Sequence, residues 1–140
     1  MRIGWIGLGN MGAPMSGRLV AAGHEVHGFD LSEAARSAAA EQGVTLEETV
    51  AATVADADVV FTMLPNHTIV KAVLGGEDGV LAHAKKGAVV VDSSTIDIDA
   101  ARELHETTVA AGLRFLDAPV SGGISGAAAG TLTFMVGGDE

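Results

Sequence analysis

The stretch "RIGWIGLGNMGAPM", residues 2–15, decides the fold. It begins as an apolar strand over 2–7 and continues as a helix from about 13 to 22. Pro14 is tolerated there because N–H groups in the first turn have no helical partner. Between strand and helix, Gly7 to Gly12 fit the pattern G-x-G-x-x-G. A strand, a glycine turn and a helix in this order are typical of a βαβ unit that binds a dinucleotide.

The rest of the chain repeats the alternation of strand and helix. Apolar runs predict strands at 25–30, 43–46, 57–64, 87–94, 113–120 and 131–138, and helical patterns cover 33–42, 47–54, 67–74 and about 99–111. Val-rich runs joined by helices indicate parallel strands that are buried on both faces. Right-handed crossovers then give an α/β fold: a doubly wound, mostly parallel Rossmann sheet with helices on both faces, in the order 3-2-1-4-5-6 with one added strand. No linker composition interrupts it, so we expect residues 1–140 to form one domain.

Composition excludes several classes of function. The net charge is −10, which disfavours nonspecific binding to nucleic acid or to an anionic membrane. There are no cysteines, hence no disulfides or thiolate metal sites, and the acidic and histidine residues lack metal-ligand spacing. No apolar run is long enough to span a membrane. The first strand begins within two residues of Met1, so we expect no signal peptide and a cytoplasmic location, or a mitochondrial one in a eukaryote.

The glycine turn and the acid that follows it predict the nucleotide. Gly7 permits the tight turn, Gly9 lets a pyrophosphate approach the backbone, and Gly12 lets the helix pack on the strand. Asp30 ends the strand 25–30, at the position from which an acid accepts hydrogen bonds from a ribose. The next two residues carry no positive charge to offset a 2′-phosphate, so the pattern predicts NAD in preference to NADP. The alternative, a glycine-rich turn beside a solvated Asp30, does not explain this context.

Three further loops are expected at the same edge of the sheet, where ligands of open parallel sheets bind. They are "LPNH" (64–67), "SSTID" (93–97) and "PVSGG" (119–123), and each carries hydroxyl, amide or glycine groups. Pro65 stiffens the first loop beside the cofactor, and Thr95 is a candidate contact on the nicotinamide side. The competing interpretation is ordinary helix capping by Asn66, Ser94, Thr95 and Ser121. His67 and Lys71 lie four residues apart, but a solvated helix turn explains them better than an acid–base pair.

These motifs together resemble the β-hydroxyacid dehydrogenases, in particular the 3-hydroxyisobutyrate dehydrogenase branch. The matching segments are "IGLGNMGAPM" (6–15), "TMLP" (62–65), "DSSTID" (92–97) and "DAPVSGGISGAAAGTLTFMVGG" (117–138). The resemblance implies NAD-dependent oxidation of a small 3-hydroxy carboxylate to its semialdehyde, as in valine catabolism. It assigns the cofactor to Gly7, Leu8, Gly9, Asn10, Met11, Gly12, Asp30, Leu64, Pro65 and Thr95. It assigns the substrate carboxylate to Ser121, Gly122 and Gly123, whose hydroxyl and backbone N–H groups suit an anion.

One part of the family pattern is absent. The family continues into an all-helical domain that supplies a catalytic lysine and a nearby asparagine, and neither motif occurs here. We therefore expect a cofactor-binding half that is inactive alone, a lysine beyond Glu140, and a homo-oligomer formed through the helical domain. Two alternatives stay open: a sibling reductase of tartronate semialdehyde, succinic semialdehyde or glyoxylate, and a noncatalytic NAD/NADH-sensing module. The "PVSGG" loop counts against the sensor, which needs no substrate clamp.

Overall fold

A seven-stranded sheet lies at the centre of the protein, with the strand order β3-β2-β1-β4-β5-β6-β9. The computed structural model describes residues 1–139. The strands are β1 (Arg2–Ile6), β2 (Glu25–Phe29), β3 (Thr45–Leu46), β4 (Val59–Thr62), β5 (Val89–Asp92), β6 (Arg114–Asp117) and β9 (Gly137–Gly138). The first six are parallel, and β9 pairs with β6 in the antiparallel sense. The expected doubly wound order with one added strand is confirmed.

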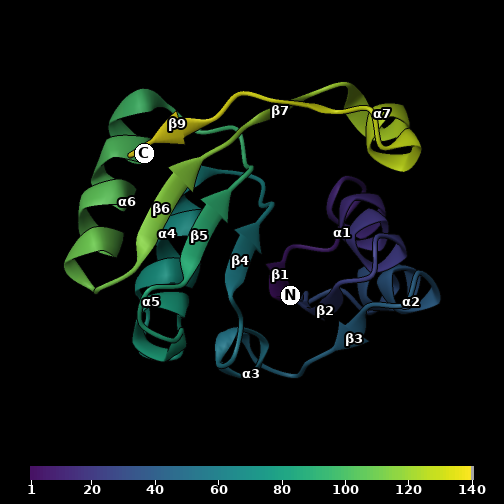
Figure 1. Cartoon of the computed structure of the whole chain (residues 1–140), viewed down its shortest axis with the longest axis horizontal. Coiled ribbons are helices and arrows are strands. Elements are labelled where there is room, and N and C mark those ends of the chain that lie inside the picture. The colour runs from purple at the N-terminus through teal and green to yellow at the C-terminus, as the bar shows by residue number, and fades with distance from the viewer. Residues whose placement is uncertain (140) are drawn as a thin grey trace.

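Helices cover the sheet from two sides (Figure 1). They are α1 (Gly12–Ala21), α2 (Glu33–Glu41), α3 (Val50–Val54), α4 (His67–Gly75), α5 (Val80–His83), α6 (Ile98–Ala110) and α7 (Gly123–Ala129). Trp5 and Ile6 are neighbours in β1 and therefore point to opposite faces. Trp5 packs in a core with α1, α2 and α7, whereas Ile6 packs in a second core with α3 to α6.

Local capping sets where four of the helices begin. The side chains of Ser32, Thr49, Asn66 and Asp97 each accept a hydrogen bond from the backbone N–H three residues later. Such caps satisfy N–H groups that have no partner within the helix. The capping interpretation is therefore correct for Asn66 and wrong for Ser94, Thr95 and Ser121, because Asp97 caps α6 and no side chain caps α7.

The segment after β6 differs from the expectation of two long strands joined by a glycine-rich loop. β6 ends at Asp117, and a two-residue strand β7 (Val120–Ser121) pairs with β8 (Thr133–Phe134) in a small sheet of its own. The expected strand 131–138 is thus divided between two sheets. The glycine-rich segment between β7 and β8 folds as α7, because Ala127 is buried in the α1 core and Gly130 ends the helix at φ +72°.

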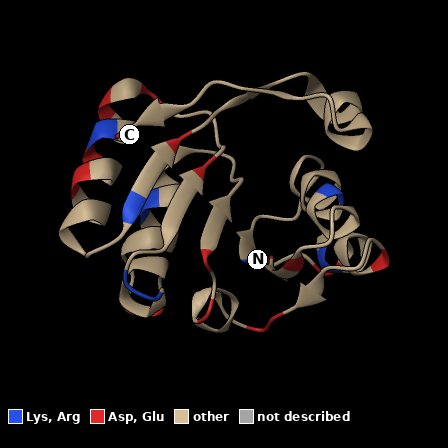
Figure 2. Ribbon diagram, in the orientation of Figure 1, with Lys and Arg blue, Asp and Glu red and all other residues tan. Residues whose placement is uncertain are grey.

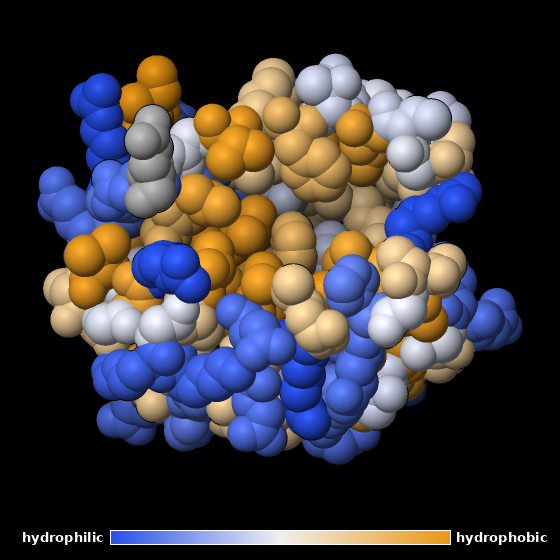
Figure 3. Space-filling model, in the orientation of Figure 1, coloured by the Kyte–Doolittle hydropathy of each residue, from blue (hydrophilic) through white to orange (hydrophobic). Residues whose placement is uncertain are grey.

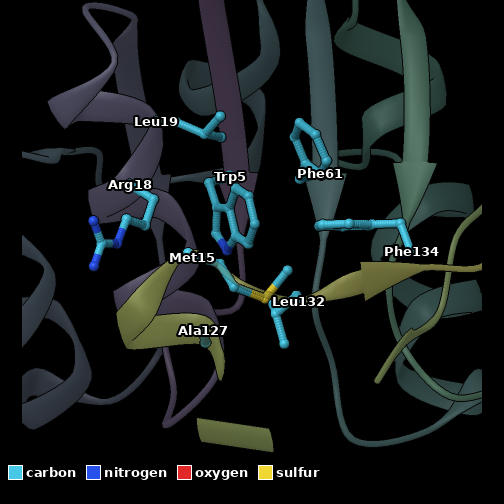
Figure 4. A pocket seen from close by; sticks show the side chains of 9 residues that line it. Trp5, Met15, Arg18, Leu19, Phe61, Ala127, Leu132 and Phe134 are labelled. Carbon is cyan, nitrogen blue, oxygen red and sulfur yellow. The ribbon is translucent and has the colours of Figure 1, made fainter. Parts of the chain in front are cut away.

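An apolar hollow opens on the α1 side of the sheet (Figure 3). Part of it is a cavity of about 190 Å³ between α1, α7, β1 and β4, in which Trp5 stacks on Phe61 with ring centroids 4.8 Å apart (Figure 4). The segment that runs beside it exposes 44% of Phe134, 52% of Met135 and 62% of Val136. Within the described part of the chain, no helix has the length and apolar character needed to cross a membrane.

Candidate dinucleotide-binding site

The glycine turn after β1 is tightly built at two of its glycines. Gly7 has φ +100° and donates its N–H to the Phe29 carbonyl oxygen at 3.0 Å. A Cβ atom on Gly7 would lie 2.1 Å from the Met63 carbonyl oxygen, and one on Gly12 would lie 1.7 Å from the Gly7 carbonyl oxygen. That same carbonyl accepts a hydrogen bond of 2.9 Å from the Trp5 ring. These two positions need glycine for the fold itself.

Gly9 is different, because nothing in the protein lies within 4 Å of a Cβ placed on it. It is exposed and borders a cavity of about 290 Å³. This cavity is lined by Gly7, Gly9, Asn10, Met11, Gly12, Asp30, Met63, Leu64 and Pro65. The structure therefore brings together most of the residues that the sequence assigned to the cofactor. Gly9 leaves room at the start of α1 for a group larger than a methyl.

The start of α1 gives this cavity its electrostatic character. The first turn of a helix carries N–H groups without helical partners and the positive end of the helix dipole, which together favour an anion. No acidic side chain occurs in the first turn of α1, and its N-cap residue Met11 provides no capping side chain. The residues present thus fit the diphosphate of a dinucleotide.

Asp30 lies directly after β2 and faces the same turn. Its Oδ2 accepts the Leu8 N–H and its Oδ1 accepts the Ser32 N–H, both at 2.8 Å. The sequence did not reveal this second use of the acid. Each carboxylate oxygen can accept a further hydrogen bond, so Asp30 can still bind ribose hydroxyls. Leu8 is fully buried and its N–H is already bonded, so Leu8 supports the turn from within.

A second cavity of about 620 Å³ continues from Asp30 along α2. Gly9, Asn10 and Asp30 border this cavity as well as the first, so the two form one groove along the glycine turn. Ile124 from α7 also lines it, although it is more than eighty positions away in the chain from every other residue that lines this cavity. No sequence motif pointed to Ile124, because its role depends on α7 packing against α1.

The three other loops leave the sheet at the same edge, as expected. Thr62, Asp92 and Asp117 end their strands in register, so the segments after β4, β5 and β6 start side by side. Ser94 is buried, and its hydroxyl accepts the Leu64 N–H at 2.8 Å, which ties two of these loops together. Thr95 and Ser121 are exposed, and within residues 1–139 their hydroxyl groups make no hydrogen bond. Thr95 and the segment Ser121–Gly123 lie outside both cavities.

Two carboxyl groups, those of Asp92 and Asp117, end strands at this edge. Burial raises the pKa of Asp92, and burial together with the charge of Asp92 raises the pKa of Asp117.

The three lysines bind other groups of the protein. Lys71 pairs with Glu103 at 2.6 Å, Lys85 pairs with Asp58, and Lys86 donates to the Ala111 carbonyl. His67 is exposed at the start of α4. In the part of the chain that the structure describes, no group of acidic and histidine residues could hold a metal ion.

Comparison with protein families identifies a domain match over nearly the whole chain. Residues 2–140 match the family described as the NAD binding domain of 6-phosphogluconate dehydrogenase. A probable 3-hydroxyisobutyrate dehydrogenase of Mycobacterium bovis is 52% identical over 99% of this chain and 46% of its own length. An NAD-dependent L-serine dehydrogenase of Pseudomonas aeruginosa is 46% identical over the same shares of the two chains. The chain thus spans about half the length of the curated relatives it matches.

A solved structure agrees with this relationship. The 3-hydroxyisobutyrate dehydrogenase of Mycobacterium tuberculosis, whose structure includes L-serine, superimposes with a TM-score of 0.94. It is 52% identical, and the match covers 99% of this chain and 47% of that one. The match therefore spans the segments of this chain that carry the glycine turn, Asp30 and the three loops at the carboxyl edge.

Proposed function

The chain belongs to the family of the NAD binding domain of 6-phosphogluconate dehydrogenase, and on that premise we propose that it is the NAD-binding half of a dehydrogenase for small 3-hydroxy carboxylates. Residues 1–140 form the nucleotide-binding domain of this enzyme. The observation that carries the proposal is the open space at Gly9, set between two glycines that the fold itself requires. The protein itself would accept a side chain at Gly9, so the glycine there is better explained by a ligand. A glycine next to the start of a helix lets a pyrophosphate approach the backbone closely.

Different residues of the groove bind different parts of the nucleotide. The diphosphate would lie at the start of α1, against Gly7, Gly9, Asn10, Met11 and Gly12, while Leu8 holds the turn from the core. Asp30 accepts hydrogen bonds from the adenosine ribose and repels a 2′-phosphate. Leu64, Pro65 and Thr95 lie on the nicotinamide side. Bound NAD supplies the hydride acceptor of the reaction.

The substrate carboxylate lies at Ser121, Gly122 and Gly123. These residues are exposed, and Gly122 and Gly123 have φ of +135° and +65°, conformations that favour glycine. Backbone N–H groups and a free hydroxyl are suitable donors for a carboxylate. They would hold the acid end of the substrate and leave its hydroxyl carbon free to react with the cofactor.

Two molecules of this class are candidate substrates. Relatives named 3-hydroxyisobutyrate dehydrogenase support the first, 3-hydroxyisobutyrate. The L-serine dehydrogenase of Pseudomonas aeruginosa supports the second, L-serine. Both molecules carry a primary hydroxyl on the carbon next to the one that bears the carboxylate. They differ only at the carbon that bears the carboxylate, which carries a methyl group in 3-hydroxyisobutyrate and an ammonium group in L-serine.

Calorimetric titration of the 140-residue chain tests the proposal. We expect NAD to bind and NADP to bind more weakly by on the order of 1–3 kcal/mol. Saturation-transfer NMR of 3-hydroxyisobutyrate and L-serine added to the NAD-saturated protein then tests the substrate loop. Ser121→Ala should reduce both signals and leave the affinity for NAD unchanged. A protein that is folded yet binds neither nucleotide would contradict the proposal.

A further inference from the structure

A row of polar side chains crosses the sheet where β4, β5 and β6 end. Thr62 is paired with Asp92, and Asp92 with Asp117, so that the three side chains point to the same face. Figure 2 shows acidic positions at the tips of both β5 and β6. Thr62 and Asp92 are fully buried, and Asp117 is partly buried. Neighbouring strands lie about 4.8 Å apart, so Asp92 and Asp117 are adjacent across the sheet, and the charge of Asp92 acts on Asp117.

The hydrogen bonds of Asp92 use one of its two oxygens. Oδ1 accepts the Thr62 hydroxyl at 2.8 Å and the Ser94 N–H at 3.1 Å. Oδ2 of Asp92 and Oδ1 of Asp117 are buried, and neither has a partner among residues 1–139. A buried, unpaired carboxylate oxygen is costly, and two adjacent carboxylates are not both ionised without a further cost.

The surrounding charges do not neutralise the two acids. Asp117 shares a cavity of about 390 Å³ with Arg102 and His105 of α6, and with Asp139. His105 is bonded to Asp139 at 3.0 Å. Lys71 of α4 is paired with Glu103 of α6. No cation of the described residues contacts Asp92, and burial raises the pKa of both acids.

We propose that Asp92 and Asp117 share a single proton, so that the O–H of one carboxyl donates to the unpaired oxygen of the other. The bond fixes the spacing between β5 and β6 at the edge where the loops 93–97 and 119–123 begin. Through Ser94, which holds the Leu64 N–H, it also positions the loop after β4. Asp92 and Asp117 are therefore positioning residues. Their effect on ligand binding rests on the proposed function, whereas the shared proton itself does not.

The shared proton can be detected directly in the 140-residue chain. Carbon-13 NMR of the aspartate carboxyl carbons, followed against pH, should show one proton retained by the pair at neutral pH. Asp92→Asn should remove that proton, because its amide can donate to Asp117 while its carbonyl still accepts from Thr62 and Ser94. Asp117→Asn provides the same test from the other side should the first variant not fold. Carboxyl carbons of both residues that titrate in the ordinary acidic range would overturn the proposal.

The affinity for NAD tests whether the Asp92–Asp117 pair positions the loops. Asp92→Ala should weaken NAD binding by about tenfold, and Asp92→Asn should restore most of that loss. The affinity of the unmodified protein should fall as rising pH removes the shared proton, whereas that of Asp92→Asn should not change over the same range. Equal losses in the Ala and Asn variants, with unchanged pH dependence, would overturn the positioning role. Failure of the unmodified protein to bind NAD would contradict the proposed function, and the NMR titration would still decide on the shared proton.

Discussion

Gly9 and Gly12 belong to one motif but are glycine for different physical reasons. A side chain at Gly12 would collide with the backbone of Gly7, whereas a side chain at Gly9 would meet no protein atom. We expect Gly12→Ala to lower the free energy of unfolding by at least about 2 kcal/mol, because backbone cannot yield as a side chain can. Gly9→Ala should leave thermal stability nearly unchanged and weaken NAD binding by about tenfold or more.

Gly75→Ala is the matched control, because Gly75 also has no neighbour within 4 Å of its Cβ position and lies away from the groove, at the end of α4. It should alter neither the melting temperature nor the calorimetric affinity. Nucleotide binding that survives Gly9→Ala would show that the pyrophosphate does not approach this turn.

Asp30 has a structural role and a role in nucleotide selectivity, and two measurements on one variant distinguish them. Asp30→Ala leaves the Leu8 and Ser32 N–H groups without their acceptor, which should lower stability by about 1–3 kcal/mol. It should also narrow the preference for NAD over NADP, because the like charge that opposes a 2′-phosphate is gone. Titrations with both nucleotides measure this preference. The control Asp56→Ala, at an exposed position, should preserve it. An unchanged ratio in Asp30→Ala would assign the selectivity to another residue.

Asp92 also gives the stability of the fold a pH dependence with a definite sign. Burial raises its pKa in the folded state above the ordinary value. Between those two pKa values the folded protein binds more protons than the unfolded chain, so stability falls as pH rises, by at most about 1.4 kcal/mol per pH unit for one proton. Denaturant unfolding at several pH values should show this slope, and Asp92→Asn should reduce it. A slope that survives the substitution would point to another group.

At the scale of single elements, the sequence predicted what depends on local chemistry. Asn66 begins a helix because its side chain accepts the N–H group three residues ahead, and such a signal is visible in the sequence. The helix α7 was missed because a segment rich in glycine has low helix propensity. What forms it is tertiary: Ala127 is buried against α1, and Arg18 of α1 donates from Nε to the Ala128 carbonyl at 2.8 Å and also from Nη2. The three consecutive alanines in "GAAAG" (126–130) were the signal in the sequence that favours this helix.

Arg18 should therefore hold α7 in place. In Arg18→Met the C-terminal end of α7 loses a charged donor, and backbone amides of the helix, such as that of Gly126, should exchange with solvent faster. Hydrogen–deuterium exchange measures this, with the amides of α4 as an internal reference. Arg102→Met is the control, since Arg102 is exposed on α6, away from α7. Unchanged exchange in α7 would mean that apolar packing alone holds it.

At the scale of the whole molecule, topology rules brought distant loops to one edge. The strand order followed from right-handed crossovers, and the carboxyl ends of parallel strands then placed the loops after β1, β4, β5 and β6 together. Topology rules did not predict two features of the structure. Ile124 reaches the groove because α7 packs on α1, and the unpaired oxygens of Asp92 and Asp117 depend on burial and register. Both require side-chain packing, which the sequence pattern does not contain.

Among residues 1–139, no lysine lies beside the proposed substrate loop. Removing hydride from a hydroxyl carbon requires that the hydroxyl proton be taken at the same time, and such catalysis contributes typically about 10²–10⁴-fold. Lys85 and Lys86 contact Asp58 and Ala111, which lie next to the amino ends of β4 and β6, opposite the edge that carries Ser121. Lys71 is paired with Glu103 between two outer helices.

We therefore expect the 140-residue chain to bind NAD and yet to produce no NADH from 3-hydroxyisobutyrate or from L-serine. The two measurements are independent, because affinity follows from the groove at Gly9 and Asp30 whereas turnover also needs a proton acceptor. NADH absorbance at saturating hydroxy acid measures turnover, and calorimetry on the same sample confirms that NAD is bound. If NADH did form, the base would lie within these residues. His67 is the first candidate, since it is exposed at the start of α4 on the loop edge, and loss of turnover in His67→Gln with NAD binding retained would establish it.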